Sequence, residues 1–477
     1  MADHDLEQAR ATIAVPDHVP SPFGELRFFD GVPTDDSIAT IYDMLDLNRA
    51  IEVYLNTIPG ASLVAMRRGF RSVGVDGNTV LGFTAPRANS GSFFLTPNTE
   101  TTYGSMFLDL RDGPLVVENP PNSLCVVDDF WFRYVADLGI AGPDRGAGGR
   151  YVLLPPGFDG PEPEGYVALR TPTITNWLIV RALGGVDDIR TTRVYPLAAA
   201  DDPPAMTYVD MASRHFNTVH ANDGTFFEEI DTLVQEEPPE ALDPERTGQC
   251  ASIGIVHGRP FAPDARMRRI LEQGARLAAA ACRALTYAPR DPAAYLYPGS
   301  NWLAVFPSGS YEFLRDHARL LDARAQFHYA ATVITPAMAA AQVGAGSAYC
   351  YTAKDAAGAW LDGARHYRLH LPAGIPAKNF WSVDVYDTQT RSLLETDDPF
   401  PSVMSLDEAV TVNGDGGADV WFGPTAPEGR EANWVQTVPG KSWFTILRLY
   451  GPLEPWFDGS WQPGEIEPIS SGTHEAS

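Results

Sequence analysis

The sequence predicts an α+β protein dominated by β structure, with two β-sandwich or jelly-roll-like lobes joined by a helical segment. Short apolar or alternating runs, split by Pro, Gly and Asp, fill residues 77–197 and return after residue 349. Short runs with frequent turn signals are typical of sandwiches and barrels. Residues 205–345 lie between them and show the apolar spacing of helices.

The changes of texture divide the 477 residues into five parts. At about 150 residues per domain, the chain has room for two large domains or roughly three smaller ones. We expect a flexible N-terminal tail over 1–35, helices and a first β-rich lobe over 36–200, a helical bridge over 201–345, a second β-rich lobe over 346–466 and a tail over 467–477.

Capping and breaking residues locate the expected helices. Asp36 can cap a helix that runs to about Asn56, because the apolar residues after it recur at helical spacing. Pro59 and Gly60 are expected to break this helix, and a second one follows near 62–70. The clearest helical stretches of the bridge are 206–217, 224–236, 263–287 and 310–331.

Composition excludes several classes of partner. A net charge of −26 repels phosphate backbones and anionic lipid, so no nucleic-acid partner is expected. The chain has no run of about 18 apolar residues, so no membrane span is expected. The N-terminus lacks the apolar core of a secretory signal. The four cysteines are far apart, which favours buried free thiols and a cytoplasmic location.

The usual cofactor and metal motifs are missing. Val435 stands where a phosphate-binding loop ending at Lys441-Ser442 would need its first glycine, so no nucleotide cofactor is expected. His366 and His370 lie in an alternating, strand-like run that separates them by roughly 13 Å, too far for one tetrahedral ion. No metal is expected, although a metal-dependent enzyme stays open if His328 or His257 meets carboxylates in space. His328 is otherwise expected to be a core histidine or a pocket base.

A series of motifs over residues 95–200 carries a family resemblance. Residues 95–103 read LTPNTETTY, and they are followed by LDL at 108–110, DDFW at 128–131, LPPG at 154–157 and RTPT at 170–173. In order and spacing these motifs resemble the family called domain of unknown function 1254. The resemblance implies a β-rich, sandwich-like domain with helices before it.

A second series of motifs lies in the last 130 residues. LPAG stands at 371–374, NFWSV at 379–383, NW at 433–434 and LRLYGP at 447–452. These motifs resemble domain of unknown function 1214, which implies a second β-rich domain after intervening helices. Together the two resemblances cover about half of the chain, and they imply no settled activity.

Strand alternation sorts the polar residues inside these motifs. Asp128 falls on the strand face that carries aliphatic and Phe side chains, where a carboxylate must be paired or raised in pKa. Arg133, Arg170 and Arg181 are its candidate partners, and both a structural ion pair and a functional acid remain open. Around residue 384, the aliphatic and Trp side chains share one face and the polar ones the other.

We expect the catalytic groups to be carboxylates and a tyrosine, in loops and strands of a rigid β scaffold. The candidate acid–base residues are Glu100, Asp128 and Tyr103. The candidate substrate-binding residues are Asn98, Arg133, Arg170, Trp177 and Trp381, with a core position as the alternative for both tryptophans. Arg448 and Tyr450 are expected to pair with Asp384 or Asp387.

Two functions fit these features. The first is a cofactor-independent enzyme, a hydrolase or lyase, that acts on a small organic molecule. The second is a non-catalytic binding protein or homo-oligomeric assembly protein, with the Trp-rich C-terminal lobe as its interface. A pocket lined by Glu100 and Asp128 would favour the enzyme. Full pairing of these side chains, with Trp443 and Trp456 in an exposed flat patch, would favour assembly.

Overall fold

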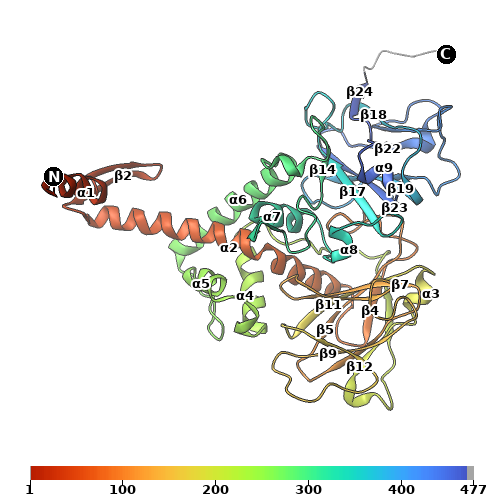
Figure 1. Cartoon of the computed structure of the whole chain (residues 1–477), viewed down its shortest axis with the longest axis horizontal. Coiled ribbons are helices and arrows are strands. Elements are labelled where there is room, and N and C mark those ends of the chain that lie inside the picture. The colour runs from red at the N-terminus through yellow and green to blue at the C-terminus, as the bar shows by residue number, and fades with distance from the viewer. Residues whose placement is uncertain (1, 470–477) are drawn as a thin grey trace.

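A computed structural model describes residues 2–469, and the side chains from residue 6 onward. Two β-rich lobes lie one above the other in Figure 1. Helices pack on the side of the lobes from which the N-terminal arm projects. The α+β, β-rich class is therefore confirmed. Most strand pairs are antiparallel, with parallel pairs only at β9–β10, β4–β13 and β21–β22 among the described strands.

The first lobe consists of a six-stranded and a four-stranded sheet. The six-stranded sheet has the order β13 (Thr207–Asp210), β4 (Val80–Phe83), β5 (Gly104–Asp109), β11 (Thr175–Ala182), β7 (Ser123–Asp129), β8 (Tyr134–Gly139). The four-stranded sheet has the order β10 (Val167–Arg170), β9 (Arg150–Leu154), β6 (Leu115–Glu118), β12 (Arg193–Pro196), and the short helix α3 (Val186–Ile189) precedes β12. Apolar side chains of both sheets share one core, as expected for a sandwich.

The second lobe also has two sheets. One has the order β14 (Leu303–Ala304), β17 (Ser347–Thr352), β23 (Trp443–Pro452), β19 (Ala377–Asp387), β20 (Ser402–Met404). The other has the order β22 (Trp434–Gln436), β21 (Ala418–Gly423), β18 (His366–Leu371), β24 (Ile466–Ile469), and the short helix α9 (Glu454–Phe457) follows β23. The expected tail over 467–477 lies mostly outside the described residues.

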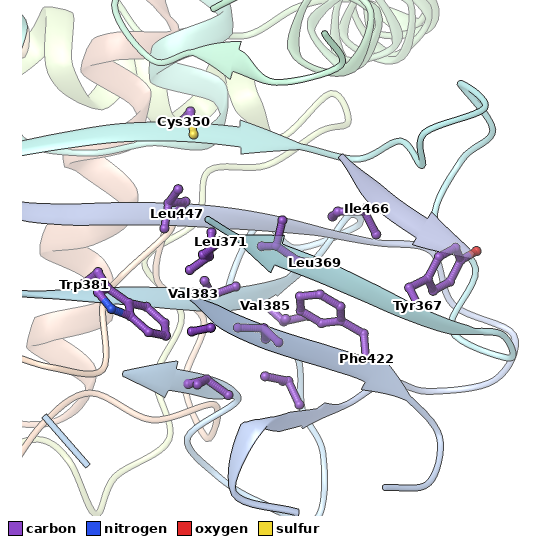
Figure 2. Packing of buried hydrophobic residues seen from close by; sticks show 14 of the residues in the cluster. Cys350, Tyr367, Leu369, Leu371, Trp381, Val383, Val385, Phe422, Leu447 and Ile466 are labelled. Atoms are coloured by element: carbon purple, nitrogen blue, oxygen red, sulfur yellow. The ribbon is translucent and has the colours of Figure 1, made fainter. Parts of the chain in front are cut away.

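The core of the second lobe lies between its two sheets. Figure 2 shows Trp381, Val383 and Val385 of β19 pointing towards Leu369 and Phe422 on the opposite sheet. Every second residue of β19 enters this core, so the residues between them face the other way, towards the first lobe. This alternation is the one predicted from the sequence.

The helical part packs around one long helix, α2 (Asp35–Ser72), which runs from the arm into the first lobe (Figure 1). The other helices are α4 (Phe226–Glu236), α5 (Pro244–Ser252), α6 (Ala265–Tyr287), α7 (Leu321–Ala330) and α8 (Pro336–Ala339). Two of the expected helices differ in the structure: 206–217 contains strand β13, and 310–331 begins with a hairpin of β15 (Leu314–Arg315) and β16 (Ala318–Arg319).

The prediction that Pro59 and Gly60 end the first helix is wrong, because α2 continues through both. A proline removes one helical hydrogen bond, a loss that tertiary packing can outweigh. Residues 57–66 are all buried here. Gly60 lies so close to Leu233 and Trp131 that a methyl group at this position would clash with Leu233 and stand 3.0 Å from Trp131 Cε3. The helix is therefore fixed by its contacts.

The N-terminal segment carries regular structure that the sequence analysis did not anticipate. It contains α1 (Ala2–Ile13) and a three-stranded sheet of β1 (His18–Ser21), β2 (Gly24–Phe29) and β3 (Val32–Pro33). With the start of α2, these elements form the arm seen at the left of Figure 1. We define this N-terminal arm as residues 2–46.

Candidate functional site

A cavity of about 280 Å³ lies between the two lobes. Its wall combines side chains of the six-stranded sheet, of the segment from α7 to α8, and of strands β17 and β23. Three parts of the chain that are distant in sequence therefore meet here. A concave site of this size at a junction of domains is a common place for a small ligand.

The first-lobe wall is one face of the six-stranded sheet. Trp177, Ile179 and Arg181 of β11 alternate onto this face, and their neighbours on β7 are Asp128, Val126 and Leu124 in that order. The sheet face is therefore apolar along its middle. Arg181 stands at its polar end, where Tyr103 precedes strand β5.

The second-lobe wall is the face of the five-stranded sheet opposite to the core residues drawn in Figure 2, and it carries both polar and apolar side chains. Tyr349 of β17 lies opposite Arg448 of β23, and Tyr351 lies opposite Ile446 in the next row of this face. Phe444 follows on β23. Each lobe thus turns one sheet face, which carries both apolar and polar side chains, towards the cavity and packs its other face into its own core.

Arg181 is the unusual group in this wall. Among the described residues its guanidinium has no hydrogen-bond or ion-pair partner, and its Nε atom is buried. Its Cζ atom lies 5.4 Å from the centre of the Tyr450 ring. Burial alone would lower the pKa of Arg181, but the nearby hydroxyls of three tyrosines and the Glu100 carboxylate raise it. The side chain is therefore a charged group without an anionic partner in contact.

Tyr103 faces the cavity beside Arg181, held by a hydrogen bond. Asn98 Nδ2 donates to Tyr103 Oη at 3.0 Å. The Asn98 Oδ1 atom accepts from the backbone of Glu100 and Thr101 and so fixes the turn. Because the tyrosine oxygen accepts this bond, its own proton remains free to point into the cavity.

A buried polar network extends from Arg448 of this wall. Arg448 Nη1 donates to Asp384 Oδ2 at 2.5 Å and to Tyr386 Oη at 2.6 Å. Tyr450 Oη donates to Glu100 Oε2 at 2.9 Å. Burial and then the Glu100 carboxylate raise the pKa of Asp384, while Arg448 lowers it. The network links Glu100 of the first lobe to Tyr450 of the second and supports the cavity wall.

Asp128 is fully buried, but it does not line the cavity. Its Oδ2 accepts from the backbone N–H of Ile334 at 3.3 Å, and its Oδ1 has no partner in the described part of the chain. Burial raises its pKa well above the usual value, with Asp129 and Asp137 adding to the effect. None of the expected arginines pairs with it: Arg133 binds the adjacent Asp129 at 2.6 Å instead.

The predicted site residues divide into two groups. Asn98, Tyr103 and Trp177 line the cavity, and Trp177 Nε1 donates to Ser105 Oγ at 2.7 Å. Glu100 lies just behind the wall through its bond to Tyr450. Three residues lie elsewhere: Arg133 is bound to Asp129, Arg170 is exposed beside Glu162, and Trp381 packs in the second-lobe core.

The structure shows neither the arrangement expected for the enzyme nor the one expected for the assembly protein. Glu100 and Asp128 are absent from the cavity wall, although Tyr103 is part of it. Trp443 is fully buried and Trp456 half-buried, so they form no exposed flat patch. Of the expected pairs, Arg448 binds Asp384, while Asp387 binds Lys441.

The histidines are not brought together with carboxylates in a metal-binding cluster among the described residues. His328 packs against Phe132 with ring centres 5.1 Å apart, and burial lowers its pKa to about 3. His257 Nδ1 contacts the Val234 carbonyl. His370 Nδ1 pairs with Asp419 Oδ1 at 2.7 Å. In the described part of the chain no helix combines the length and apolarity needed to cross a bilayer.

Sequence reasoning missed the cavity roles of Arg181, Tyr349 and Arg448. One available signal was the position of Arg181, which shares a strand face with Trp177 and Ile179. An arginine on the same face as buried apolar residues needs either a partner or a cavity. Tyr349 carried no comparable signal, since its role depends on how the lobes meet.

Comparison with known families matches both β-rich parts of the chain. The family described as "Protein of unknown function (DUF1254)" matches residues 78–199, and "Protein of unknown function (DUF1214)" matches residues 346–454. The chain therefore contains a region that matches DUF1254 followed by a region that matches DUF1214. No curated protein matches this DUF1254–DUF1214 chain.

Two solved structures are similar to the DUF1254–DUF1214 chain. The VPA0106 protein of Vibrio parahaemolyticus is 19% identical with a TM-score of 0.51, and the match covers 89% of this chain and 100% of that one. An uncharacterised protein of Burkholderia cenocepacia is 16% identical with a TM-score of 0.40, over 91% and 96% of the two chains. The Vibrio structure shows a shared fold.

The cavity lies where the DUF1254 and DUF1214 parts meet. Asn98 and Tyr103 belong to the LTPNTETTY motif of the first part, and Arg448 belongs to the LRLYGP motif of the second. Arg181 and Tyr349 also come one from each part. Motifs that define the two domains separately thus converge on one wall.

Proposed function

We propose that this protein is a cofactor-independent enzyme that acts on a small organic molecule bound in the cavity between the lobes. The observation that supports this most directly is the combination of an apolar wall with a few convergent polar groups. Trp177 and Ile179 form the apolar part, while Tyr103, Arg181 and Tyr349 supply the polar part. Sites for small organic molecules commonly have this composition.

Tyr103 is the proposed proton-transfer group. Its hydroxyl accepts from Asn98, so its proton is directed towards the bound molecule. Arg181 is close enough to stabilise negative charge that develops next to it in a poorly hydrated site. Hydrolase or lyase chemistry needs both a positioned acid and charge stabilisation, and neither requires a nucleotide.

The test uses a cavity-blocking variant together with Tyr103→Phe. Purified protein is screened against a metabolite library by thermal shift, and hits are then assayed for turnover by mass spectrometry. Ala330→Phe places a bulky ring in the wall and is expected to abolish the ligand-induced shift. Ala280→Phe, at an exposed site on α6, is the matched control and should keep the shift.

Tyr103→Phe separates catalysis from binding. This variant is expected to retain ligand-induced shifts within about threefold in affinity and to lose about 10²–10⁴-fold in turnover, the usual contribution of a positioned acid or base. Normal turnover in Tyr103→Phe would remove this residue from the mechanism. If ligands shift Ala330→Phe as strongly as the wild type, the cavity is not their site.

Assembly is the second candidate function, and one feature of the N-terminal arm favours it. Large apolar side chains are exposed along the arm, with Phe29 81% and Val32 65% exposed. Within the three-stranded sheet, β1 and β3 pair only with β2, so both outer edges are open. A second copy of this chain fits such a surface, because a twofold interface needs only one self-complementary patch and open edges pair readily.

Sedimentation velocity tests the arm. The wild type is expected to form a dimer or larger assembly, and the double change Phe29→Glu with Val32→Glu is expected to yield monomers. Leu277→Glu, an exposed apolar position on α6 outside the arm, serves as the control and should leave the assembly intact. A wild type that stays monomeric at high concentration would rule out this role for the arm.

A further inference from the structure

The strongest unexplained feature of the molecule is the positively charged side chain of Arg181, which has no negatively charged partner in contact. Arg181 lies in the cavity wall, and its guanidinium forms no hydrogen bond or ion pair with the residues that the structure describes. A buried charged group that lacks a partner costs several kcal/mol in the folded protein. Folded proteins retain such a group when something outside the chain completes it.

We infer that the cavity binds an organic carboxylate whose headgroup pairs with Arg181 and whose apolar body lies along the Trp177–Ile179 face. This inference rests on the proposed function and names the class of its substrate. The guanidinium is planar and presents donors in a fixed fork that matches the two oxygens of a carboxylate.

The surroundings of Arg181 fit a headgroup with a single negative charge. The other arginine of the wall, Arg448, is already bound to Asp384 at 2.5 Å. One guanidinium is therefore available, which balances one negative charge. A phosphate monoester carries nearly two charges at neutral pH and would be left with unbalanced charge in this site. Tyr103 and Tyr349 add hydroxyls near the same point, suited to donate to carboxylate oxygens.

The rest of the wall fits the apolar body of such a molecule. Beyond Arg181, the same strand face continues as Ile179 and Trp177, with Val126 beside them on β7. Met211 and Phe216 line the cavity from the segment that follows β13. Removing apolar surface from water adds roughly 25 cal/mol per Å², so this part contributes affinity while Arg181 fixes the orientation.

Asp137, the one carboxylate that the described residues place in the cavity wall, does not favour a cationic ligand. Asp137 accepts hydrogen bonds from Thr335 Oγ1 at 2.9 Å and interacts with the Tyr134 hydroxyl at 3.2 Å. Burial raises its pKa, which disfavours its charged form. Its acceptor oxygens are thus engaged, whereas the donors of Arg181 are not.

Matched probes test the charge preference. Octanoate and 3-phenylpropanoate are each compared with the primary amide and the amine of the same carbon skeleton, by calorimetric titration into the full-length protein. The wild type is expected to bind the carboxylates at least about tenfold more tightly than the amides, corresponding to about 1.4 kcal/mol. Equal or tighter binding of the amides or amines would overturn the inference.

Variants at position 181 link the preference to this residue. Arg181→Gln is expected to reduce carboxylate affinity at least about tenfold and amide affinity by less than about threefold. Arg181→Lys keeps the positive charge but lacks the paired N–H donors of the guanidinium, so it should restore part of the carboxylate preference. Circular dichroism checks that both variants are folded. Arg269→Gln, at an exposed site on α6, is the control and should match the wild type. An unchanged preference in Arg181→Gln would overturn the inference.

The cavity-blocking variant separates this inference from the proposed function. If an uncharged or cationic molecule binds the wild type and not Ala330→Phe, the cavity is a ligand site but its ligand is no carboxylate, so only the inference fails. If no probe or library member binds in a way that depends on Ala330, both the inference and the proposed function fail.

Discussion

Replacing each cavity arginine by methionine should give opposite outcomes for the stability of the free protein. Arg181 has no polar partner in the described structure, whereas Arg448 holds Asp384 and Tyr386 and also donates to the Thr96 carbonyl at 3.0 Å. Methionine has a similar length and no charge. The comparison therefore measures what each guanidinium contributes to the fold.

For Arg181→Met two opposing contributions nearly cancel. The change relieves an unsatisfied buried donor, which costs about 1–3 kcal/mol. It also removes the cation–π contact with Tyr450, worth about 0.5–2 kcal/mol. The net effect expected from these ranges lies between about 2.5 kcal/mol in favour of the variant and about 1 kcal/mol against it. A group that stabilises only the ligand complex should behave in this way.

For Arg448→Met both contributions have the same sign. Asp384, fully buried, would lose its ionic partner, and breaking a buried pair from one side costs about 3–5 kcal/mol. The loss should be smaller at pH 5.5 than at pH 8, because Asp384 can be protonated once Arg448 no longer lowers its pKa.

Scanning calorimetry on ligand-free protein measures the two variants. At about 2.1 cal/mol/K of unfolding entropy per residue, a chain of 477 residues shifts its melting temperature by about 1 °C per kcal/mol. Arg448→Met should melt about 3–5 °C lower at pH 8, whereas the melting temperature of Arg181→Met should fall by at most about 1 °C or rise by up to about 2.5 °C. Arg269→Met controls for loss of an exposed arginine. If Arg181→Met loses as much stability as Arg448→Met, Arg181 is a structural support and its assignment to a ligand is refuted.

Two further predictions concern the framework of the site. Gly60→Ala should lower stability by about 1–3 kcal/mol in the same calorimetric assay, because its methyl group would press on Leu233 and Trp131; Gly248→Ala in helix α5, with open space around it, should be neutral or stabilising. Burial raises the pKa of Glu237 to about 7, above its usual 4.5, so its stabilising contribution is complete below about pH 4.5 and is lost as the pH rises through 7. The melting temperature of the wild type should therefore fall between pH 5 and pH 8 relative to that of Glu237→Gln. A difference between the two proteins that stays constant across this range would contradict a raised pKa at Glu237.

Local patterns were sufficient for the parts of the fold set by neighbouring residues. Alternation placed Trp381, Val383 and Val385 on the core side of β19, as the structure has them. The helix expected over 263–287 is α6, and Asp264 caps it by accepting from Met267 N at 2.7 Å. The four cysteines are buried and free, as their spacing indicated.

The remaining features depend on contacts between distant segments. Pro59 lies inside α2 because residues far along the chain, such as Leu233, pack against this turn. The period of a strand does not tell whether a face meets its own core or a neighbouring lobe. For that reason Asp128 could be placed on the apolar face of β7, while its single partner, the backbone of Ile334, could not be foreseen.

The contacts between the lobes indicate how the cavity is reached. The segment before Asn98 is tied to the second lobe and to α7: Tyr386 donates to the Pro97 carbonyl, Arg448 to the Thr96 carbonyl, and Thr96 Oγ1 to the Ala330 carbonyl. This side of the cavity is therefore closed by hydrogen bonds that bridge the lobes.

The opposite side has a different character. The cavity-lining residues Ala141, Ala337 and Gly346 are exposed, and they come from the turn after β8, from α8 and from the approach to β17. Figure 1 shows α8 between the two lobes. All three residues are small and exposed, so this side is the expected route by which a ligand reaches Arg181 and Tyr103.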